Sequence, residues 1–368
     1  MASTPRTERT ATRSRTASWK VARLAATCDC VLSGDLLPLI LAHIDPMADS
    51  ARHAEVCTTW SRFVAQQLDS RRMLRREAVY GGTRGAGDGE LQMPSHVAAL
   101  PSGDGRCDIL ISDTYNDRCI RMTTSGEFAG YLHECVRPRG LAVDGHAVYV
   151  GEFTNHRICR LALRRNGDIQ HGPQYGHQGS ASTDAPALMG PWYPEGCAIS
   201  SRWLFCADSK RHRIVVYEKT TLRFVRAFGS RGSGDGELIS PCGVAIGPGT
   251  ASRPPLVFVC DKGNHRISIF TRSGAFVRTI GRFGSQPGSF RDPHSIVFAH
   301  GRMYVSESAA HRVQAFSFAG RPAGEVQCSG ERGSLGGICA VGPMLYVADA
   351  SNHAIHCLRA LISTATPD

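Results

Sequence analysis

A short apolar strand that ends in an acidic residue occurs six times in this chain. Its copies are CDILISD, AVYVGE, WLFCAD, LVFVCD, RMYVSE and MLYVAD, which end at Asp113, Glu152, Asp208, Asp261, Glu307 and Asp349. The steps between successive acids are 39, 56, 53, 46 and 42 residues, a period typical of repeated supersecondary units. Strands this short cannot form a core alone, so the pattern predicts six units that stack face to face.

An arginine follows the acid by five residues in five of the six units, and a second strand begins at this arginine. The arginines are Arg118, Arg157, Arg213, Arg266 and Arg312, and the last unit has Ala354 instead. We expect each acid to pair with its arginine and to hold the turn between the two strands. Histidines precede this position at His156, His212, His265, His311 and His353. Because a repeated element points to six places around a ring, we interpret these groups as structural rather than catalytic.

A second recurring element opens the strand upstream of each acid: a proline, one variable residue, and a glycine or serine. It occurs as Pro138-Arg139-Gly140, Pro194-Glu195-Gly196, Pro241-Cys242-Gly243 and Pro293-His294-Ser295, with Pro94-Ser95-His96 as a looser copy. Short strands joined by Gly, Asn and Asp turns at this period predict an all-β, six-bladed β-propeller over residues 75–360. The strand near 76–82 should complete the last blade, because the ring would otherwise keep an unpaired edge.

The segments Asn155-His156-Arg157-Ile158 and Asn264-His265-Arg266-Ile267 resemble the NHL repeat, and the resemblance extends over about residues 75–358. It implies the NHL type of six-bladed propeller that occurs in tripartite-motif NHL proteins. Such propellers look like interaction platforms in most contexts, and they bind RNA or protein on one face. The resemblance therefore implies a binding module.

The residues after the opening prolines should ring the mouth of the central channel, and the loops after the acids should lie on the same side. Aromatic and cationic side chains at these places suit RNA stacking or the capture of an acidic peptide. The predicted recognition face comprises Tyr115, Arg139, Phe153, Glu195, Lys210, Arg211, Lys262 and His294. Enzymes on related propellers include an amidating lyase with histidine-bound zinc in this channel. Here the ring offers only His294, Glu195 and Cys242 as ligands, so we expect no metal site, cofactor or catalytic residue.

Residues 31–72 have a helical rather than a strand period, and we expect a small helical module there. The apolar side chains that define its helix faces are Leu37, Ile40, Ile44, Val56 and Trp60. The stretch 32–65 resembles an F-box, a helical module that docks a protein onto the Skp1 subunit of a cullin ubiquitin ligase. The resemblance implies partner docking through the five apolar side chains. The alternative is a plain helical cap that shields the edge of the propeller.

The net charge, the cysteine pattern and the lengths of the apolar runs limit the expected cellular compartment and the kinds of site. The net charge is +10, and the basic tail at residues 1–30 is expected either to be disordered or to act as an organelle transit peptide. The 14 cysteines include no C-x-x-C pair, so the sequence lacks RING zinc ligands, and a reducing cytoplasmic or nuclear home is favoured. No apolar run approaches the length of a membrane span, so no membrane contact is expected.

These features favour a non-catalytic interaction platform, and most specifically a substrate-recognition adaptor of a cullin-type ubiquitin ligase. In this hypothesis the helical module binds a Skp1-like subunit while the propeller binds a target protein, and no small-molecule substrate is expected. Two alternatives stay open at this point. One is an RNA-binding NHL propeller, which the basic balance and the cationic loops suggest, and the other is a metal-dependent propeller lyase.

Overall fold

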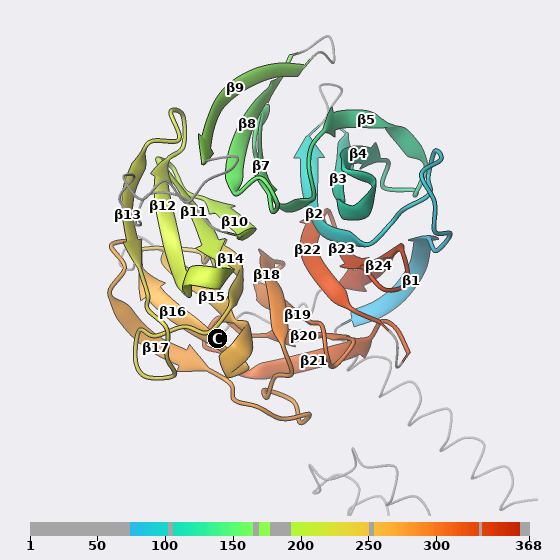
Figure 1. Cartoon of the computed structure of the whole chain (residues 1–368). Helices are drawn as coiled ribbons and strands as arrows, with labels where there is room; N and C mark the ends of the chain where they lie inside the picture. Colours follow the sequence, from blue (N-terminus) through green and yellow to red (C-terminus); the bar gives the residue numbers. More distant parts are fainter. Residues whose placement is uncertain are drawn as a thin grey trace, which may run out of the picture. The chain divides into compact units, whose positions relative to one another are not determined.

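The computed structural model describes residues 74–101, 106–164, 169–176, 193–249, 254–330 and 333–360. Its strands form six four-stranded antiparallel sheets, which stand as blades around a central axis (Figure 1). The all-β, six-bladed propeller predicted from the repeat is thereby confirmed. The tail at 1–30 and the helical module at 31–72, with its five candidate docking side chains, lie outside the described residues.

Each blade runs from an inner strand beside the central axis to an outer strand at the rim (Figure 1). Blades 1 and 2 consist of β2 (Pro94–Pro101), β3 (Cys107–Asp113), β4 (Arg118–Met122) and β5 (Phe128–Glu134), then β6 (Pro138–Asp144), β7 (Ala147–Glu152), β8 (Arg157–Leu163) and β9 (Ile169–Gly176). Blades 3 and 4 consist of β10 (Pro194–Ile199), β11 (Trp203–Asp208), β12 (Arg213–Glu218) and β13 (Phe224–Phe228), then β14 (Pro241–Ile246), β15 (Leu256–Asp261), β16 (Arg266–Thr271) and β17 (Phe276–Ile280). Blades 5 and 6 consist of β18 (Pro293–Ala299), β19 (Arg302–Glu307), β20 (Arg312–Phe316) and β21 (Pro322–Gln327), then β22 (Leu335–Val341), β23 (Met344–Asp349), β24 (Ala354–Ala360) and β1 (Leu74–Gly81).

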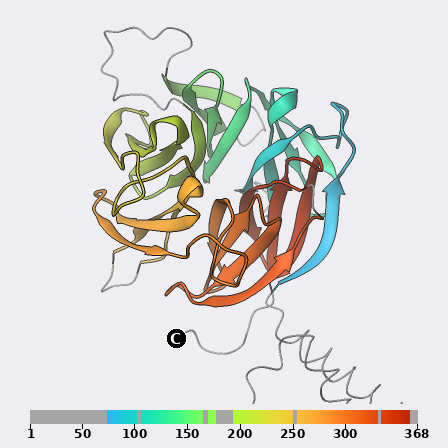
Figure 2. The same ribbon diagram turned by 60° about the horizontal axis from the view of Figure 1, so that its bottom comes forward.

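The ring closes because its first strand completes its last blade. Strand β1 pairs antiparallel with β24, from Leu74 opposite Ala360 to Gly81 opposite Ala354. Figure 2 shows this cyan strand beside the red strands from the other end of the chain. It begins two residues earlier than the range expected from the sequence. The pairing covers the edge that β24 would otherwise expose.

The hydrophobic core lies between blades rather than within any one sheet. One cluster, for example, joins Tyr346 and Ile355 of blade 6 to Val97 and Ile109 of blade 1. Every residue of β7 is buried, because each sheet is covered on both faces by its neighbours. Six such clusters follow one another around the ring, so each blade depends on the next for its core.

The glycines of the blade-opening element allow the inner strands to approach each other closely. A Cβ atom on Gly140 would lie 1.7 Å from the carbonyl oxygen of Glu195 in the next blade. A Cβ atom on Gly243 would lie 2.5 Å from the carbonyl oxygen of His294. No side chain fits at such distances, so glycine is required for backbone contact rather than for an unusual torsion. These contacts bring the variable residues of successive blades together at the axis.

Candidate functional site

Each inner strand carries an irregularity directly after its opening residue. In blade 2, Pro138 pairs with Glu152 and Leu141 with Val150, so the inner strand holds one extra residue. The same shift occurs in the other five blades. Such a β-bulge re-aims a side chain away from the regular pleat. The residues that follow the opening position are Ser95, Arg139, Glu195, Cys242, His294 and Gly336.

The turns after the repeated acids lie at the same end of the blades as these bulges. Asp261, for example, is paired in register with Pro241, so the turn η3 (Lys262–Asn264) begins beside the start of β14. Two further turns, η1 (Thr114–Asn116) and η2 (Ser209–Arg211), follow the acids of blades 1 and 3. The bulge residues and the turns therefore share one face of the propeller, as the recognition hypothesis requires.

The structure brings five acids of the repeat against their arginines. The arginine Nε lies 2.6 to 3.0 Å from a carboxylate oxygen in each pair. Asp261 is fully buried, and it also accepts hydrogen bonds from the Ile239 N–H (2.7 Å) and the Asn264 amide (2.9 Å). Charge-assisted bonds of this kind satisfy a buried carboxylate and fix the turn that follows it.

The repeat arginines have a second role that the sequence analysis did not predict. The guanidinium of Arg266 donates to the carbonyl oxygens of Ser233, Gly234 and Glu237 at 2.9 to 3.0 Å. Arg118 holds the corresponding glycine-rich loop before blade 1 in the same way. Each of these arginines thus ties its own blade to the loop that leads into it. The near-identical loop sequences around residues 80–92 and 228–239 were the feature of the sequence from which this contact could have been predicted.

The last blade replaces the missing arginine by a histidine two residues further on. Because Ala354 occupies the arginine position, the carboxylate of Asp349 instead lies 2.9 Å from Nε2 of the buried His356. Burial alone would raise the pKa of Asp349, but hydrogen bonds from His356, Asn352 and the Ser334 N–H outweigh it and hold that pKa well below its usual range. The acid of the closing blade therefore stays charged.

The histidines of the repeat connect neighbouring blades. They occupy the left-handed region, with φ between 52° and 54°. In three of them Nδ1 accepts a hydrogen bond from the backbone N–H just before the next opening proline: His353 from Met93 (3.0 Å), His212 from Ser240 (2.9 Å) and His265 from Asp292 (3.2 Å). Asp117 stands in this position in blade 1 and accepts the equivalent bond from Arg137. These side chains act as latches between blades and do not converge on one centre.

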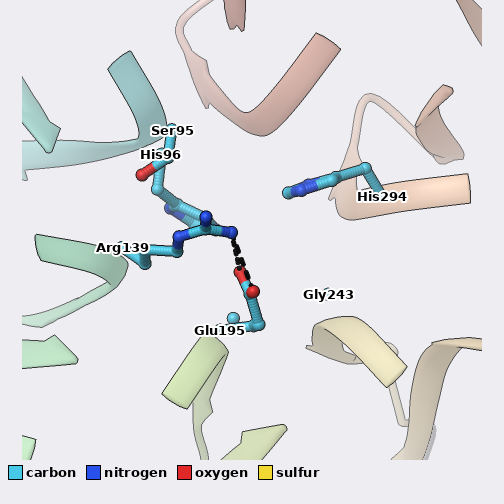
Figure 3. A pocket seen from close by; sticks show the side chains of 7 residues that line it. Ser95, His96, Arg139, Glu195, Gly243 and His294 are labelled. Carbon is cyan, nitrogen blue, oxygen red and sulfur yellow. Dashed lines mark hydrogen bonds and ion pairs between the residues drawn. The ribbon is translucent and has the colours of Figure 1, made fainter. Parts of the chain in front are cut away.

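A hollow at the channel mouth brings together the bulge residues of several blades (Figure 3). It encloses about 200 Å³, counting the part open to solvent. The hollow is lined by Ser95, His96, Arg139, Glu195, Gly196, Gly243 and His294. Figure 3 shows the side chains of Arg139 and Glu195 meeting on one side, with His294 reaching in from the other. Nη1 of Arg139 lies 2.8 and 3.1 Å from the two carboxylate oxygens of Glu195.

A row of two aromatic side chains between two cationic ones borders the hollow. The guanidinium of Arg139 lies 4.2 Å from the centre of the Phe153 ring. Phe153 stacks on Tyr193, with ring centres 4.2 Å apart and planes 11° from parallel. The ammonium of Lys210 lies 5.5 Å from the centre of the Tyr193 ring. The row joins predicted face residues of blades 2 and 3 into one surface.

Not all predicted face residues gather at the hollow. Tyr115 lies on η1, where the guanidinium of Arg137 covers its ring at 3.9 Å. Arg211 ends η2, on the turn that also carries Lys210. Lys262 begins η3, and its positive charge lowers the pKa of both His294 and Cys242. Of the predicted face residues, the hollow is thus lined by Arg139, Glu195 and His294, with Phe153, Lys210 and Lys262 at its border.

Burial keeps the ionisable groups of the hollow neutral, apart from its ion pair. It lowers the pKa of His96 to about 4. It also lowers the pKa of His294 well below the usual value, and the positive charges of Lys262 and Arg139 act in the same direction. Burial, assisted by the charge of Glu195, raises the pKa of the Cys242 thiol to about 12. Both imidazoles and the thiol are therefore uncharged at neutral pH.

The lowered pKa of His96 predicts a loss of stability in acid. The folded state binds a proton on His96 less readily than the unfolded chain does. The contribution of the neutral imidazole to the free energy of unfolding is therefore complete above pH ~6.5 and is lost as the pH falls towards 4. Between pH 6.5 and 4 we expect the free energy of unfolding to fall by about 2 kcal/mol less in the His96→Gln variant than in the wild type. This value allows for partial exposure of the ring. Urea unfolding at several pH values measures this difference. Exposed His146→Gln is the control, and parallel pH curves for wild type and His96→Gln would contradict the prediction.

Sequence reasoning missed two residues of this region. His96 occupies the position where the blade-opening element has glycine or serine, and its ring packs where a Cβ atom on Gly337 would lie. Tyr193 directly precedes Pro194, a position that the repeat pattern did not single out. The departure from glycine at His96 was a usable signal, whereas the contact between Tyr193 and Phe153 depends on the packing of two blades.

Comparison with known proteins agrees with the repeat and the fold. No known family profile matches this chain. A segment of 80 residues is 35% identical to the RING finger protein nhl-1 of Caenorhabditis elegans. The described part of the chain is a six-bladed β-propeller. The matched segment is 22% of this chain and spans only 8% of that relative, so the likeness concerns a short segment and not the whole relative.

Solved structures resemble this six-bladed propeller in fold at low sequence identity. A protein of unknown function from Bacteroides thetaiotaomicron has a TM-score of 0.56 at 14% identity, covering 78% of this chain and 75% of its own. A gluconolactonase from Xanthomonas campestris has a TM-score of 0.52 at 15% identity, covering 74% of this chain and 87% of its own. At such identities these likenesses concern the fold alone.

Among the residues that the structure describes, no group of three or more His, Cys, Asp or Glu side chains is placed to hold a metal ion. The same part of the chain contains no helix that is long and apolar enough to cross a membrane.

Proposed function

We propose that this chain is a substrate-recognition adaptor of a cullin-type ubiquitin ligase. The propeller binds a target protein at its channel mouth, and the segment 32–65 docks onto a Skp1-like subunit. The observation that carries the proposal is the convergence of Arg139, Glu195 and His294, from three different blades, in one hollow. A charged hollow bordered by aromatic side chains suits protein recognition.

The sequence and its relative agree with a role in ubiquitination. The relative that matches 80 residues of this chain is a RING finger protein, whereas the cysteines of this chain lack C-x-x-C pairs. An F-box-like segment would link the propeller to the ligase in place of a RING module. Catalysis then rests on proximity, because the adaptor holds a target lysine near a thioester carried by another subunit. No residue of this chain needs to be chemically reactive.

The RNA-binding alternative is less well supported by the geometry of the aromatic side chains. Base stacking needs an accessible ring face. The two faces of Phe153 are engaged by Arg139 and by Tyr193. RNA binding through the Phe153 ring would have to displace these contacts. A lyase would need converging ligands or acid–base groups, and the likeness to a gluconolactonase at 15% identity does not supply them.

Capture of a purified Skp1-like subunit by the full chain tests the proposal. We expect the wild type to bind it, and the Leu37→Ala, Ile40→Ala, Trp60→Ala triple variant to lose binding while the propeller stays folded. A matched triple replacement of polar residues in the same segment, at His43, Arg52 and Arg62, should leave capture unchanged. Failure of the folded wild type to bind the Skp1-like subunit would overturn the adaptor function.

A further inference from the structure

The hollow at the channel mouth contains buried polar atoms without partners. Nδ1 of His96, Nδ1 of His294 and Nε of Arg139 are buried and have no hydrogen-bond partner in the described part of the chain. A buried polar group without a partner costs free energy, so native proteins rarely leave several together. Their concentration at one opening of the ring points to a polar group that enters from outside.

The hollow also has an uncompensated positive charge. The carboxylate of Glu195 neutralises Arg139 through two short contacts. The ammonium of Lys262, by contrast, has no hydrogen-bond or ion-pair partner among the described residues, although its positive charge lowers the pKa of both His294 and Cys242. Lys210 adds a second ammonium at the border, beside the Tyr193 ring. The two imidazoles carry no charge at neutral pH. The hollow and its border therefore carry a net positive charge, which favours an anionic ligand.

We propose that the hollow binds a carboxylate of an acidic peptide segment in the target protein. The ammonium of Lys262 pairs with this carboxylate, and the imidazole of His294 donates a hydrogen bond to it. The hollow is too small to admit a folded surface, so only the end of one side chain or a chain terminus would reach its lining. The stacked rings of Phe153 and Tyr193 give the neighbouring peptide residues an apolar wall. This inference rests on the proposed function, because it names the chemical class of the target.

The probe is a set of four synthetic peptide pools incubated with the full chain. The pools are randomised hexapeptides with a central glutamate or glutamine, each with a free or an amidated C-terminus. Retained peptides are identified by mass spectrometry, and the affinity of labelled members is measured by fluorescence anisotropy. We expect amidated glutamate peptides to be retained over glutamine peptides if a side-chain carboxylate binds. Retention that requires the free terminus would instead assign the hollow to a C-terminal carboxylate.

Two substitutions should change the affinity in opposite directions. Lys262→Met removes the unpaired charge and should weaken binding about tenfold, whereas Lys262→Arg should retain most of it. Glu195→Gln should strengthen binding several-fold, because it frees the charge of Arg139 while keeping the shape of the side chain. A merely structural role would weaken binding in both variants. Lys219→Met, which removes the same charge at the opposite end of blade 3, is the matched control.

Three results would overturn the inference. They are equal retention of the four pools, unchanged affinity of the folded Lys262→Met variant, and competition of the peptides by a twelve-nucleotide uridine RNA that binds more tightly. The last result would assign the hollow to nucleic acid. Because peptide binding does not use the segment 32–65, it can fail while Skp1 capture succeeds, and the reverse also holds. The two proposals are therefore tested separately.

Discussion

Replacing Asp261 by alanine should lower the free energy of unfolding of the propeller by about 3–5 kcal/mol. The carboxylate is fully buried, and it accepts bonds from the Ile239 N–H, the Asn264 amide and the guanidinium of Arg266. With the hydroxyl of Ser268, which also donates to this carboxylate, four donors lose their acceptor, and a largely buried arginine loses its counter-charge. The same arginine holds the loop that leads into blade 4, so the damage should extend to the interface with blade 3.

Urea unfolding followed by circular dichroism measures this loss. The matched control is Asp235→Ala, because Asp235 is exposed on the neighbouring loop and its replacement should change stability by less than about 0.5 kcal/mol. Equal stability of the Asp261→Ala and Asp235→Ala variants would show that the repeated acid does not stabilise the blade. The interpretation of the acids as structural rather than catalytic would then have to be abandoned.

Gly140→Ala should lower the stability by about 1–3 kcal/mol and also weaken binding at the channel mouth. Its Cβ atom would lie 1.7 Å from the carbonyl oxygen of Glu195, so the inner strands of blades 2 and 3 must move apart. Because the atom in the way belongs to the backbone, no side-chain rotation can relieve the contact. The movement would shift Glu195 itself, and with it the ion pair to Arg139.

Gly330→Ala is the control for this substitution. A Cβ atom at Gly330 has no heavy atom within 4 Å, and neither glycine has a positive φ, so the two variants differ only in the space around the new methyl group. We expect Gly330→Ala to resemble the wild type in thermal unfolding and in retention of acidic peptides. Wild-type stability of Gly140→Ala would mean that the inner strands are not held at the spacing described here.

The repeat made most of the fold predictable from the sequence. Six acids in phase identified six blades, and the strand before the first unit was correctly expected to close the ring. The blade-opening prolines also identified the residues of the channel mouth, because a bulge at one fixed place presents the same position in every blade. A regular repeat is a local feature, and it can be recognised in a single sequence.

The rest of the site depends on contacts between blades, which a local pattern does not record. Arg139 and Glu195 are 56 residues apart, and they meet only because their blades are neighbours. The histidine latches were likewise not foreseen, since each bond joins one unit to the next. Tyr193 was missed because its stacking partner Phe153 belongs to another blade. The helical module could not be compared, since it lies outside the described residues.

Amide hydrogen exchange of the full chain, alone and saturated with the tightest-binding acidic peptide, tests whether the propeller recognises its target at the channel mouth. We expect slower exchange at the starts of the inner strands, around residues 137–140, 193–196, 240–243 and 292–295. Slower exchange confined to the opposite ends of the blades or to the outer strands, with the peptide bound, would contradict it.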